Sequence, residues 1–210
     1  HGNIAAKFAG VKKTFNSITG LGSIFISGNF FIRNFLILTL KISLLFKKSF
    51  LLLQNKDDLE FIKKISLPGS DSAYLMSASG VDVKKFKATK EPRGKVVFLF
   101  ASRIINDKGI NELIEASKIL KSKKNNFELY IAGKTDSQNP SSVSKNDLER
   151  WESLNYIKYL GYIKNVHELY KKIHVCILPS YREGLPKNLL EAASSSKPII
   201  TTDVPGCREV

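Results

Sequence analysis

Short apolar runs alternate with amphipathic helical patterns from Lys95 to the end of the chain. The expected strands are 96–102, 127–132, 156–162, 174–179 and 198–202, and the expected helices are 111–120, 144–152, 166–172 and 186–195. The run 96–102 (VVFLFAS) is continuously apolar, which is typical of a strand buried on both faces. Regular alternation of this kind predicts an α/β fold, in which helices cover both faces of a parallel sheet.

The pattern over the first 94 residues is less regular. Helices are expected at 3–9 and 57–64, strands at 13–17, 50–54 and 73–76, and a Gly-rich turn at 20–22. The charged stretch 84–93 contains Pro92 and few apolar residues, so we interpret it as a linker. We therefore predict an amino-terminal domain at 1–80, a hinge at 81–95 and a carboxyl-terminal domain at 96–210.

The most apolar segment of the chain is 30–53. A membrane-spanning helix needs about 20 mostly apolar residues. Arg33 and Lys41 interrupt this run, and a lysine at the bilayer centre costs about 2.5–3.5 kcal/mol. We therefore favour a buried helix of a globular domain over a spanning helix. A basic amphipathic helix that lies on an anionic membrane surface is the alternative.

The composition narrows the class of protein. Apolar residues make up 43% and charged residues 25% of the chain, which excludes disordered and collagen-like classes. The 33 basic and 19 acidic residues give a net charge of +14, which points to an anionic partner such as phosphate, nucleic acid or an acidic membrane. Two cysteines, Cys176 and Cys207, are too few for a disulfide scaffold, and no spacing suggests zinc.

Candidate ligand-binding residues are expected directly after the strands, because ligands of such sheets bind at the carboxyl ends of the strands. Arg103 and Lys108 follow the first strand of the second half, where a guanidinium and an ammonium suit a diphosphate. Glu183 lies in an expected loop and Glu191 in the following helix, so both can accept hydrogen bonds from hydroxyls of one ligand. From these residues alone, the alternatives are favoured: solvated surface cations, a surface Glu183 and a salt-bridged Glu191.

The ordered set of motifs in the second half is more specific. They are ASRIINDKGI (101–110), YIAG (130–133), YIKYLGYI (156–163), LPSYREGLPKNLLEAA (178–193) and KPIITTDVPGCREV (197–210). With them, the stretch from Ser102 to Val210 resembles the carboxyl-terminal domain of the family-four retaining glycosyltransferases of the GT-B fold. The earlier segments HGNIAAKFAGVKKTFNSITGLGSIF, FLLLQNKDDLEFI and SASGVDVKKF are similar to the later part of that family's amino-terminal domain. The subgroup most resembled is the bacterial capsular or lipopolysaccharide type.

The resemblance implies two Rossmann-like domains, the first partial and the second nearly complete. It also implies that Arg103 and Lys108 hold the donor diphosphate and balance the charge on the departing nucleotide. The donor is then a nucleotide sugar used as a substrate, and the family usually needs no metal or other cofactor.

Further residues take roles from the same motifs. Glu183 matches the first glutamate of the motif, beside the donor sugar, and is therefore a catalytic candidate together with the two cations. Gly184 and Leu185 match the loop whose backbone amides approach the sugar and the diphosphate. Glu191 matches the glutamate that binds the ribose hydroxyls, and Gly133 ends the YIAG motif among the expected donor-binding residues.

The implied activity is the transfer of a sugar, with retention, to a lipid-linked or polysaccharide acceptor. The implied location is the cytoplasm, at the inner face of the cell membrane, with peripheral membrane contact and no nucleic-acid partner. The alternative is an inactive relic or a basic protein that binds membranes or polyanions.

The chain departs from the family pattern in three places. It does not contain the family's Gly-rich beginning, its active-site histidine or its last helices, so we expect a chain truncated at both ends. His1 does not occupy the position of that histidine, and His167 and His174 are expected at the surface or at strand ends. Ser196 stands where the family usually has glycine after a helix, so we expect a left-handed backbone there.

Overall fold

The computed structural model describes residues 2–22, 29–44, 49–65, 72–76 and 80–210. Its backbone forms two compact units. The first unit comprises residues 1–79 with 182–185 and 205–209, and the second comprises residues 80–181, 186–204 and 210. The apolar segment of the sequence interpretation, 30–53, lies partly outside the described residues.

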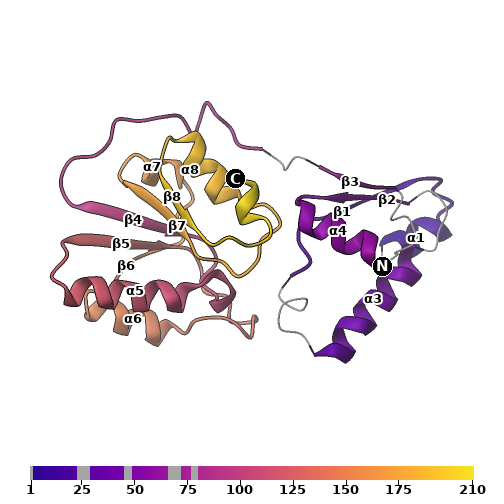
Figure 1. Ribbon diagram of the computed structural model, residues 1–210, viewed down its shortest axis with the longest axis horizontal. Coiled ribbons are helices and arrows are strands. Elements are labelled where there is room, and N and C mark those ends of the chain that lie inside the picture. Colours follow the sequence, from indigo (N-terminus) through magenta and orange to yellow (C-terminus); the bar gives the residue numbers. More distant parts are fainter. Residues whose placement is uncertain (1, 23–28, 45–48, 66–71, 77–79) are drawn as a thin grey trace. The chain divides into compact units, whose positions relative to one another are not determined.

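The second unit is built on a parallel sheet whose strands have the order β6-β5-β4-β7-β8 (Figure 1). The strands are β4 (Val96–Ala101), β5 (Phe127–Ala132), β6 (Lys158–Gly161), β7 (Val175–Leu178) and β8 (Ile199–Thr201). In the central strand, Leu99 pairs with Tyr130 of β5 on one side and with Cys176 of β7 on the other. From β4, the next strands β5 and β6 are added on one side of the sheet, and β7 and β8 are added on the other side. The strand order therefore switches between β4 and β7, and such a switch point opens a crevice at the carboxyl ends of the strands.

Helices lie on both faces of this sheet. They are α5 (Ile110–Ser122), α6 (Lys145–Ser153), α7 (His167–Tyr170) and α8 (Lys187–Ser194). Figure 1 shows α5 and α6 on one face and α7 and α8 on the other. Leu99 and Phe100 of β4 and Ile131 of β5 are fully buried between these layers, as expected for strands that helices cover on both sides. The predicted α/β class is therefore confirmed.

The expected elements of the second unit are all present, with ends that differ by one or two residues. The Ser144 hydroxyl accepts a hydrogen bond from the Asp147 backbone N–H at 3.0 Å, so Ser144 caps α6. Pro186 is the capping residue of α8, one position before the first helical turn. Ser196 has a φ of 55°, which confirms the predicted left-handed backbone.

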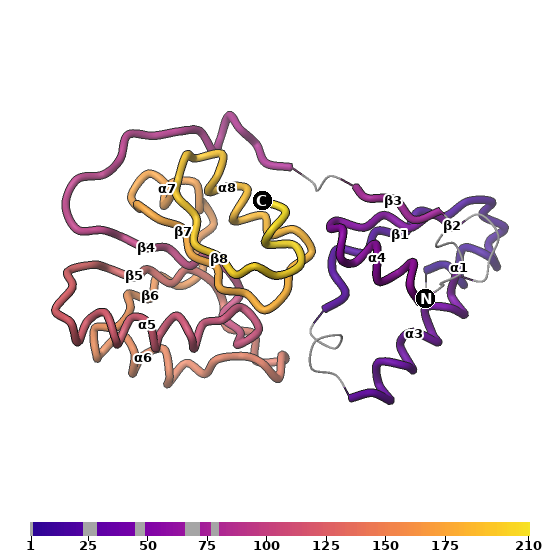
Figure 2. The backbone as a smooth tube through the Cα atoms, viewed as in Figure 1, coloured from indigo at the N-terminus to yellow at the C-terminus, as the bar shows by residue number. Residues whose placement is uncertain are grey.

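Residues 80–95 contain no helix or strand and lead into β4 (Figure 2). The Phe86 ring is buried and packs edge-on against Tyr170 at 5.7 Å between ring centroids. The ring of His174, directly before β7, accepts a hydrogen bond from the Val97 N–H and lies 3.0 Å from the Pro92 carbonyl. These contacts attach the segment to the second unit, while the domain boundaries stay a prediction.

The first unit contains a parallel sheet of order β1-β2-β3. Its elements are α1 (Gly2–Phe8), β1 (Thr14–Ile18), α3 (Phe30–Leu44), β2 (Ser49–Leu53), α4 (Lys56–Lys64) and β3 (Ala73–Leu75), together with the short turn η3 (Cys207–Glu209). A core cluster includes Leu51 and Leu53 of β2 and Ile62 of α4. The Asn55 side chain caps α4 by accepting a hydrogen bond from the Asp58 N–H at 2.8 Å.

The prediction of a buried helix at the apolar segment was wrong for the residues that the structure describes. Leu44 is the one described residue of α3 that is buried, and Leu40 packs against the core beside it. Phe31 and Phe35 are 77% and 64% exposed. The sequence is apolar on every side of this helix, but the sheet covers only the side that carries Leu40 and Leu44. No helix among the described residues has the length and apolar character needed to cross a membrane.

Candidate functional site

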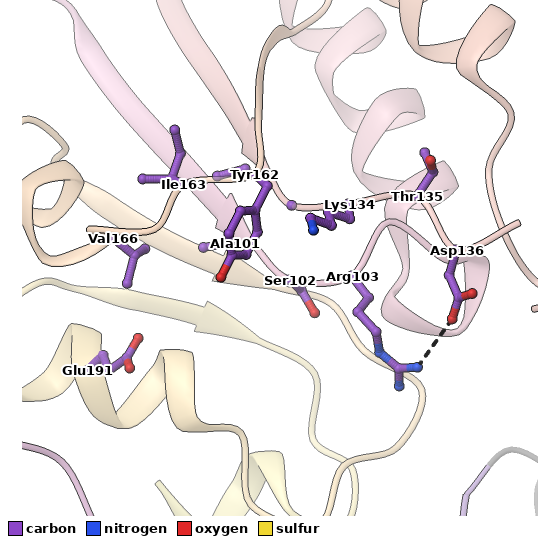
Figure 3. Close-up of a pocket in the computed structure, with 12 residues that line it drawn as sticks. Ala101, Ser102, Arg103, Lys134, Thr135, Asp136, Tyr162, Ile163, Val166 and Glu191 are labelled. Carbon is purple, nitrogen blue, oxygen red and sulfur yellow. Dashed lines mark ion pairs between the residues drawn. The ribbon is translucent and has the colours of Figure 1, made fainter.

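A pocket of about 510 Å³ opens in the second unit at the carboxyl ends of β4, β5 and β6 (Figure 3). The lining residues come from the ends of β4 and β5, from the loops after the three strands and from α8; they are Ala101, Ser102, Arg103, Ala132, Gly133, Lys134, Thr135, Asp136, Tyr162, Ile163, Val166 and Glu191. The pocket therefore lies where the strand order predicts a ligand. It brings together three of the predicted site residues, Arg103, Gly133 and Glu191.

Arg103 provides a cation at one side of the pocket. It follows β4, and its guanidinium Nη1 lies 3.8 Å from the Asp136 carboxylate on the loop after β5 (Figure 3). The Arg103 side chain is 61% exposed and that of Asp136 is 38% exposed. An exposed ion pair of this length is weak, about 0–1 kcal/mol, so an anionic ligand can replace Asp136 as the partner of Arg103.

An aromatic ring lies at another wall of the pocket. Tyr162 follows β6 and is 63% exposed, and the Lys134 ammonium lies 4.5 Å from the centroid of its ring. Exposed aromatic faces stack on planar rings of a ligand, and a lysine over the ring adds a positive charge nearby. This wall can therefore hold a planar group next to an anionic one.

Glu191 provides a carboxylate from α8. The residue is 8% exposed, and its carboxylate points toward the pocket (Figure 3). Burial raises the pKa of the Glu191 carboxyl above its usual value, and the positive charges of Lys187 and Lys85 oppose that rise. The Asn188 side chain holds α8 against the sheet by donating to the Ala101 carbonyl at 3.0 Å. A fixed, partly desolvated carboxylate of this kind is suited to accept hydrogen bonds from ligand hydroxyls.

Glycine is required at position 133 because the backbone there lies against the loop after β4. A Cβ atom at Gly133 would lie 1.8 Å from the Ser102 carbonyl oxygen. Its absence lets the end of β5 approach the loop after β4, and this approach brings the two loops that carry Arg103 and Asp136 together.

Lys108 lies in the short 3₁₀ turn η2 (Asn106–Lys108) beyond β4 and does not line the pocket. The next residue, Gly109, has a φ of +71°, and a Cβ atom there would lie 2.0 Å from the Pro179 carbonyl oxygen. Glycine is therefore required to turn the chain from Lys108 into α5 against the loop after β7.

Asp107, next to Lys108, joins three loops. Its carboxylate accepts a hydrogen bond from the Ser141 hydroxyl at 2.7 Å, and its own N–H donates to the same hydroxyl at 3.2 Å. Its carbonyl accepts from the Tyr181 N–H at 3.0 Å and from the Ser180 hydroxyl at 3.2 Å. The loops after β4, β5 and β7 are thus fixed to one another behind the candidate phosphate-binding cations.

Sequence reasoning did not single out Asp107, Asp136 or Ser141. The available signal was their position: each lies in a polar loop that follows a predicted strand. Nothing in the local pattern distinguishes these residues from ordinary loop residues, because the hydrogen bonds and the ion pair connect positions about 33 residues apart.

The remaining predicted residues, Glu183, Gly184 and Leu185, belong to the first unit. The Gly184 carbonyl accepts a hydrogen bond from the Asn55 side chain at 2.9 Å. A Cβ atom on Gly184 would lie 1.6 Å from the Thr19 carbonyl oxygen. We expected this glycine to let a ligand approach the backbone, but within this unit its small size accommodates a neighbouring backbone segment. The roles of all seven predicted site residues stay predictions.

The sequence model of the family described as "Glycosyl transferases group 1" matches residues 82–210. The chain is 30% identical to the N,N'-diacetylbacillosaminyl-diphospho-undecaprenol alpha-1,3-N-acetylgalactosaminyltransferase of Campylobacter jejuni, over 99% of the chain and 57% of that protein. It is 29% identical to the capsular polysaccharide biosynthesis glycosyltransferase CapM of Staphylococcus aureus, over 62% of the chain and 36% of that protein. The chain therefore spans about half the length, or less, of these relatives.

Solved structures agree with the fold. The structure of HepE from Anabaena in complex with UDP matches with a TM-score of 0.77 at 17% identity, over 99% of this chain and 58% of that one. A sucrose-phosphate synthase from Thermosynechococcus elongatus matches with a TM-score of 0.74 at 17% identity, over 93% and 51%. These likenesses confirm the α/β architecture of the GT-B type that the sequence motifs implied.

Proposed function

Because the chain belongs to the group 1 glycosyl transferases, we propose that it transfers a sugar from a nucleotide-sugar donor to a lipid-linked or polysaccharide acceptor. We further propose that transfer retains the configuration of the donor sugar, as the resemblance to family-four enzymes implies. Because the chain spans only part of its relatives, the proposal concerns the donor half of the reaction most directly.

One observation carries the donor side of the proposal. The pocket at the carboxyl ends of β4, β5 and β6 is lined by a cation, Arg103, and by a buried carboxylate, Glu191. The exposed ring of Tyr162 also lines it. A nucleoside diphosphate presents matching groups: an anionic diphosphate, ribose hydroxyls and a planar base. The relative HepE was solved with UDP, which is a ligand of this chemistry.

In the proposed reaction, negative charge develops on the departing diphosphate, next to Arg103 and Lys108. The bond between the anomeric carbon and the diphosphate breaks, and both electrons leave on the diphosphate. A bond from the anomeric carbon to the acceptor oxygen forms on the same face of the sugar, and the proton of the acceptor hydroxyl passes to an oxygen of the departing diphosphate. Arg103 and Lys108 stabilise the charge that develops on the departing diphosphate, which is the role that a metal has in other transferases.

The remaining groups orient the donor. Glu191 accepts hydrogen bonds from the ribose hydroxyls, and Gly133 allows the loops after β4 and β5 to close around the phosphates. Glu183 and the backbone of Gly184 and Leu185 act at the donor sugar, in line with the family motif that they match. No cofactor besides the donor substrate enters this scheme.

The acceptor side follows from the relatives. The name of the Campylobacter jejuni relative contains a diphospho-undecaprenol acceptor, and CapM is named for capsular polysaccharide. We propose an acceptor of this class for the present chain, and hence work in the cytoplasm at the inner face of the cell membrane.

A binding titration tests the donor site directly. The full chain is titrated with UDP, GDP and ADP by calorimetry, in parallel with Arg103→Ala and Glu191→Ala. We expect at least one nucleoside diphosphate to bind, and each substitution to weaken its affinity by about tenfold to hundredfold, since each removes a charge-assisted contact of roughly 1.5–3 kcal/mol.

Two control substitutions keep this test specific. Arg93→Ala and Glu149→Ala make the same charge changes at exposed positions outside the pocket, and they should leave binding unchanged. Binding that weakens equally in the controls, that falls steeply with salt and that extends to heparin and RNA would instead support the alternative, a general polyanion-binding protein.

A further inference from the structure

Two polar residues at the start of α4 are completely buried. Asn55, which caps the helix, and Asp58, in its first turn, are each 0% exposed. The Asp58 N–H donates to the Asn55 side-chain oxygen at 2.8 Å, and the Asn55 side-chain nitrogen donates to the Asp58 carboxylate at 3.0 Å. The helix cap needs only the first of these hydrogen bonds. Capping alone therefore does not explain why the Asp58 carboxylate is buried.

The Asp58 carboxylate is paired with Arg182. The Arg182 Nη2 donates to the Asp58 Oδ1, and the Arg182 side chain is 19% exposed. Both residues belong to the first unit, although they are 124 positions apart in the chain. Removing two charges from water is costly, so a buried ion pair is weak evidence for a gain in stability. What the pair does fix is the path of the segment that carries Arg182.

The backbone that follows Arg182 is held as well. The Asn55 side-chain nitrogen donates to the Gly184 carbonyl at 2.9 Å and to the Glu183 carbonyl at 3.4 Å. The Glu183 N–H donates to the Pro205 carbonyl at 3.0 Å. The segment is thus bound through one side chain and through the backbone on both sides of Glu183.

Close packing leaves this segment little freedom. A Cβ atom on Gly206, where φ is +83°, would lie 2.4 Å from the Glu183 carbonyl oxygen. The Thr19 carbonyl closes off the Gly184 position in the same way. Functional side chains keep their geometry when packing and hydrogen bonds lock the residues that support them. Glu183, for which a role at the donor sugar is proposed above, is surrounded by such locks.

We propose that Asp58 and Arg182 are positioning residues for Glu183. The buried pair anchors the side chain directly before Glu183, and Asn55 anchors the carbonyl groups at and after it. The segment then has one backbone conformation before a donor arrives, so donor binding does not have to order it. The inference rests on the proposed function for the role of Glu183, whereas the anchoring is a property of the first unit by itself.

A role in stability alone fits these contacts less well. Apolar residues of similar volume often replace a buried ion pair with no loss of stability. The negative charge that suits the start of a helix is already supplied by Asp57, whose side chain is 34% exposed and lies 3.3 Å from Arg208. Asp58 differs from Asp57 in its burial and in its partner, which precedes Glu183.

Amide hydrogen exchange of the full chain, measured by NMR, tests the anchoring without any ligand. The variant Asp58→Asn/Arg182→Met removes both charges and keeps similar volumes, so no buried charge is left unpaired. We expect the Glu183 amide to exchange at least about tenfold faster, because local opening of the segment no longer breaks the pair. Amides of β2 and β4 should be unchanged. Arg182→Lys keeps a cation beside Asp58 and should retain most of the protection.

Asp57→Asn is the matched control. It removes a carboxylate from the same turn of α4 and breaks only an exposed ion pair, so the Glu183 amide should exchange as in the original chain. Circular dichroism shows that each variant is folded. Equal acceleration at Glu183 in this control would overturn the inference. Faster exchange throughout β2 as well as at Glu183 would also overturn it, because the pair would then serve overall stability.

Calorimetry on the same proteins tests the role at the donor sugar. Each nucleoside diphosphate is compared with a nucleotide sugar of the same base: UDP-glucose, GDP-mannose or ADP-glucose. Asp58→Asn/Arg182→Met should leave the affinity for the diphosphate unchanged, because the pocket with Arg103 and Glu191 belongs to the second unit. It should weaken nucleotide-sugar binding by about fivefold, which corresponds to one hydrogen bond of about 1 kcal/mol.

The two experiments separate this inference from the proposed function. If no nucleoside diphosphate binds but the Glu183 amide responds as expected, the proposed function fails and the anchoring stands. If the diphosphates bind and the Glu183 amide does not respond, the inference is wrong and the proposed function is unaffected. An unchanged affinity for the nucleotide sugar in a variant with a loosened segment would overturn the positioning role at the donor sugar.

Discussion

The Arg103 guanidinium and the Asp136 carboxylate form an ion pair of 3.8 Å at one side of the candidate donor pocket, from loops that follow neighbouring strands. Both groups line the pocket, so a diphosphate that enters it meets one attractive charge and one repulsive charge. Asp136 occupies the place of an anionic ligand beside Arg103. This arrangement makes the carboxylate a competitor of the donor.

The substitution Asp136→Asn should therefore strengthen binding. It removes the repulsion and releases Arg103 from its partner, and exposed pairs of this kind are worth about 0.2–1 kcal/mol. We expect the affinity for a nucleoside diphosphate to rise by about twofold to fivefold, as measured by calorimetry. Asp147→Asn, which removes the charge from an ion pair of 3.3 Å with Arg150 on α6, serves as the control and should have no effect. Weaker binding by Asp136→Asn would show that the carboxylate instead holds Arg103 in its productive position.

Ser141 is expected to act as a positioning residue for the phosphate-binding loop. Ser141→Ala removes both hydrogen bonds to Asp107 and loosens η2, which carries Lys108. We expect about a fivefold loss of nucleoside diphosphate affinity, because a lost hydrogen bond is worth about 1 kcal/mol. Ser141→Thr keeps the hydroxyl and should restore affinity.

The neighbouring Ser137→Ala is the control for Ser141, since it changes an exposed hydroxyl of the same loop. A purely structural role for Ser141 would lower the melting temperature in Ser141→Ala without a change in the affinity of the folded protein. That result would contradict the positioning role.

Gly109→Ala should destabilise the second unit strongly. The new Cβ atom would lie 2.0 Å from the Pro179 carbonyl oxygen, and the backbone at Gly109 has a φ of +71°. Strain and overpacking together predict a loss of at least about 2 kcal/mol in the free energy of unfolding, measured by denaturant titration. Gly161→Ala is a matched control, because Gly161 has a similar φ of +65° but open space around its Cβ position. We expect it to lose only about 1 kcal/mol, and equal losses would show that the contact with Pro179 is unimportant.

Ser196→Gly should stabilise the protein. Ser196 has a φ of 55° directly after α8 and its cap Ser195, where a non-glycine residue is strained. Relief of this strain predicts a gain of about 1 kcal/mol, which raises the melting temperature by about 2–4 °C in a chain of this size. Ser153→Gly, at the helical end of α6, should instead lower it, because glycine destabilises a helix. A melting temperature that falls in Ser196→Gly would contradict the strain argument.

The buried Glu191 carboxyl predicts a pH dependence of stability. Burial raises its pKa in the folded chain above the unfolded value of 4.5, so the folded chain binds this proton more tightly. The contribution of Glu191 to stability is therefore present below pH 4.5 and is lost as the pH rises through the folded pKa. We therefore expect the original chain to lose stability relative to Glu191→Gln as the pH rises from 4.5 through the folded pKa of Glu191. Above that pKa, the difference in unfolding free energy between the two proteins should be constant.

Glu191→Asp is the control for this pH effect, because it keeps a carboxyl group at the site and should keep most of the pH dependence. Denaturant titrations between pH 4 and 8 measure all three proteins. A difference between Glu191→Gln and the original chain that stays constant over the whole range would show that the pKa is not raised.

The sequence by itself determined the order and type of the elements. The strand at β4 and the left-handed backbone at Ser196 were predicted, because apolar periodicity and turn conformation depend on residues close together in the chain. The positions of Arg103 and Glu191 at the ligand-binding edge followed from the strand order that such elements adopt.

Tertiary structure alone decided which surfaces are covered and which distant groups meet. The stripe of Phe31 and Phe35 is apolar enough for a core, yet it is exposed, because burial depends on what the rest of the chain places against a helix. The pairing of Ser141 with Asp107 and of Asp136 with Arg103 joins separate loops, and no local pattern encodes such contacts. The physical reason is the same in each case: the periodicity of an element depends on neighbouring residues, whereas packing, hydrogen bonds between loops and charge pairing depend on parts of the chain that only the fold brings together.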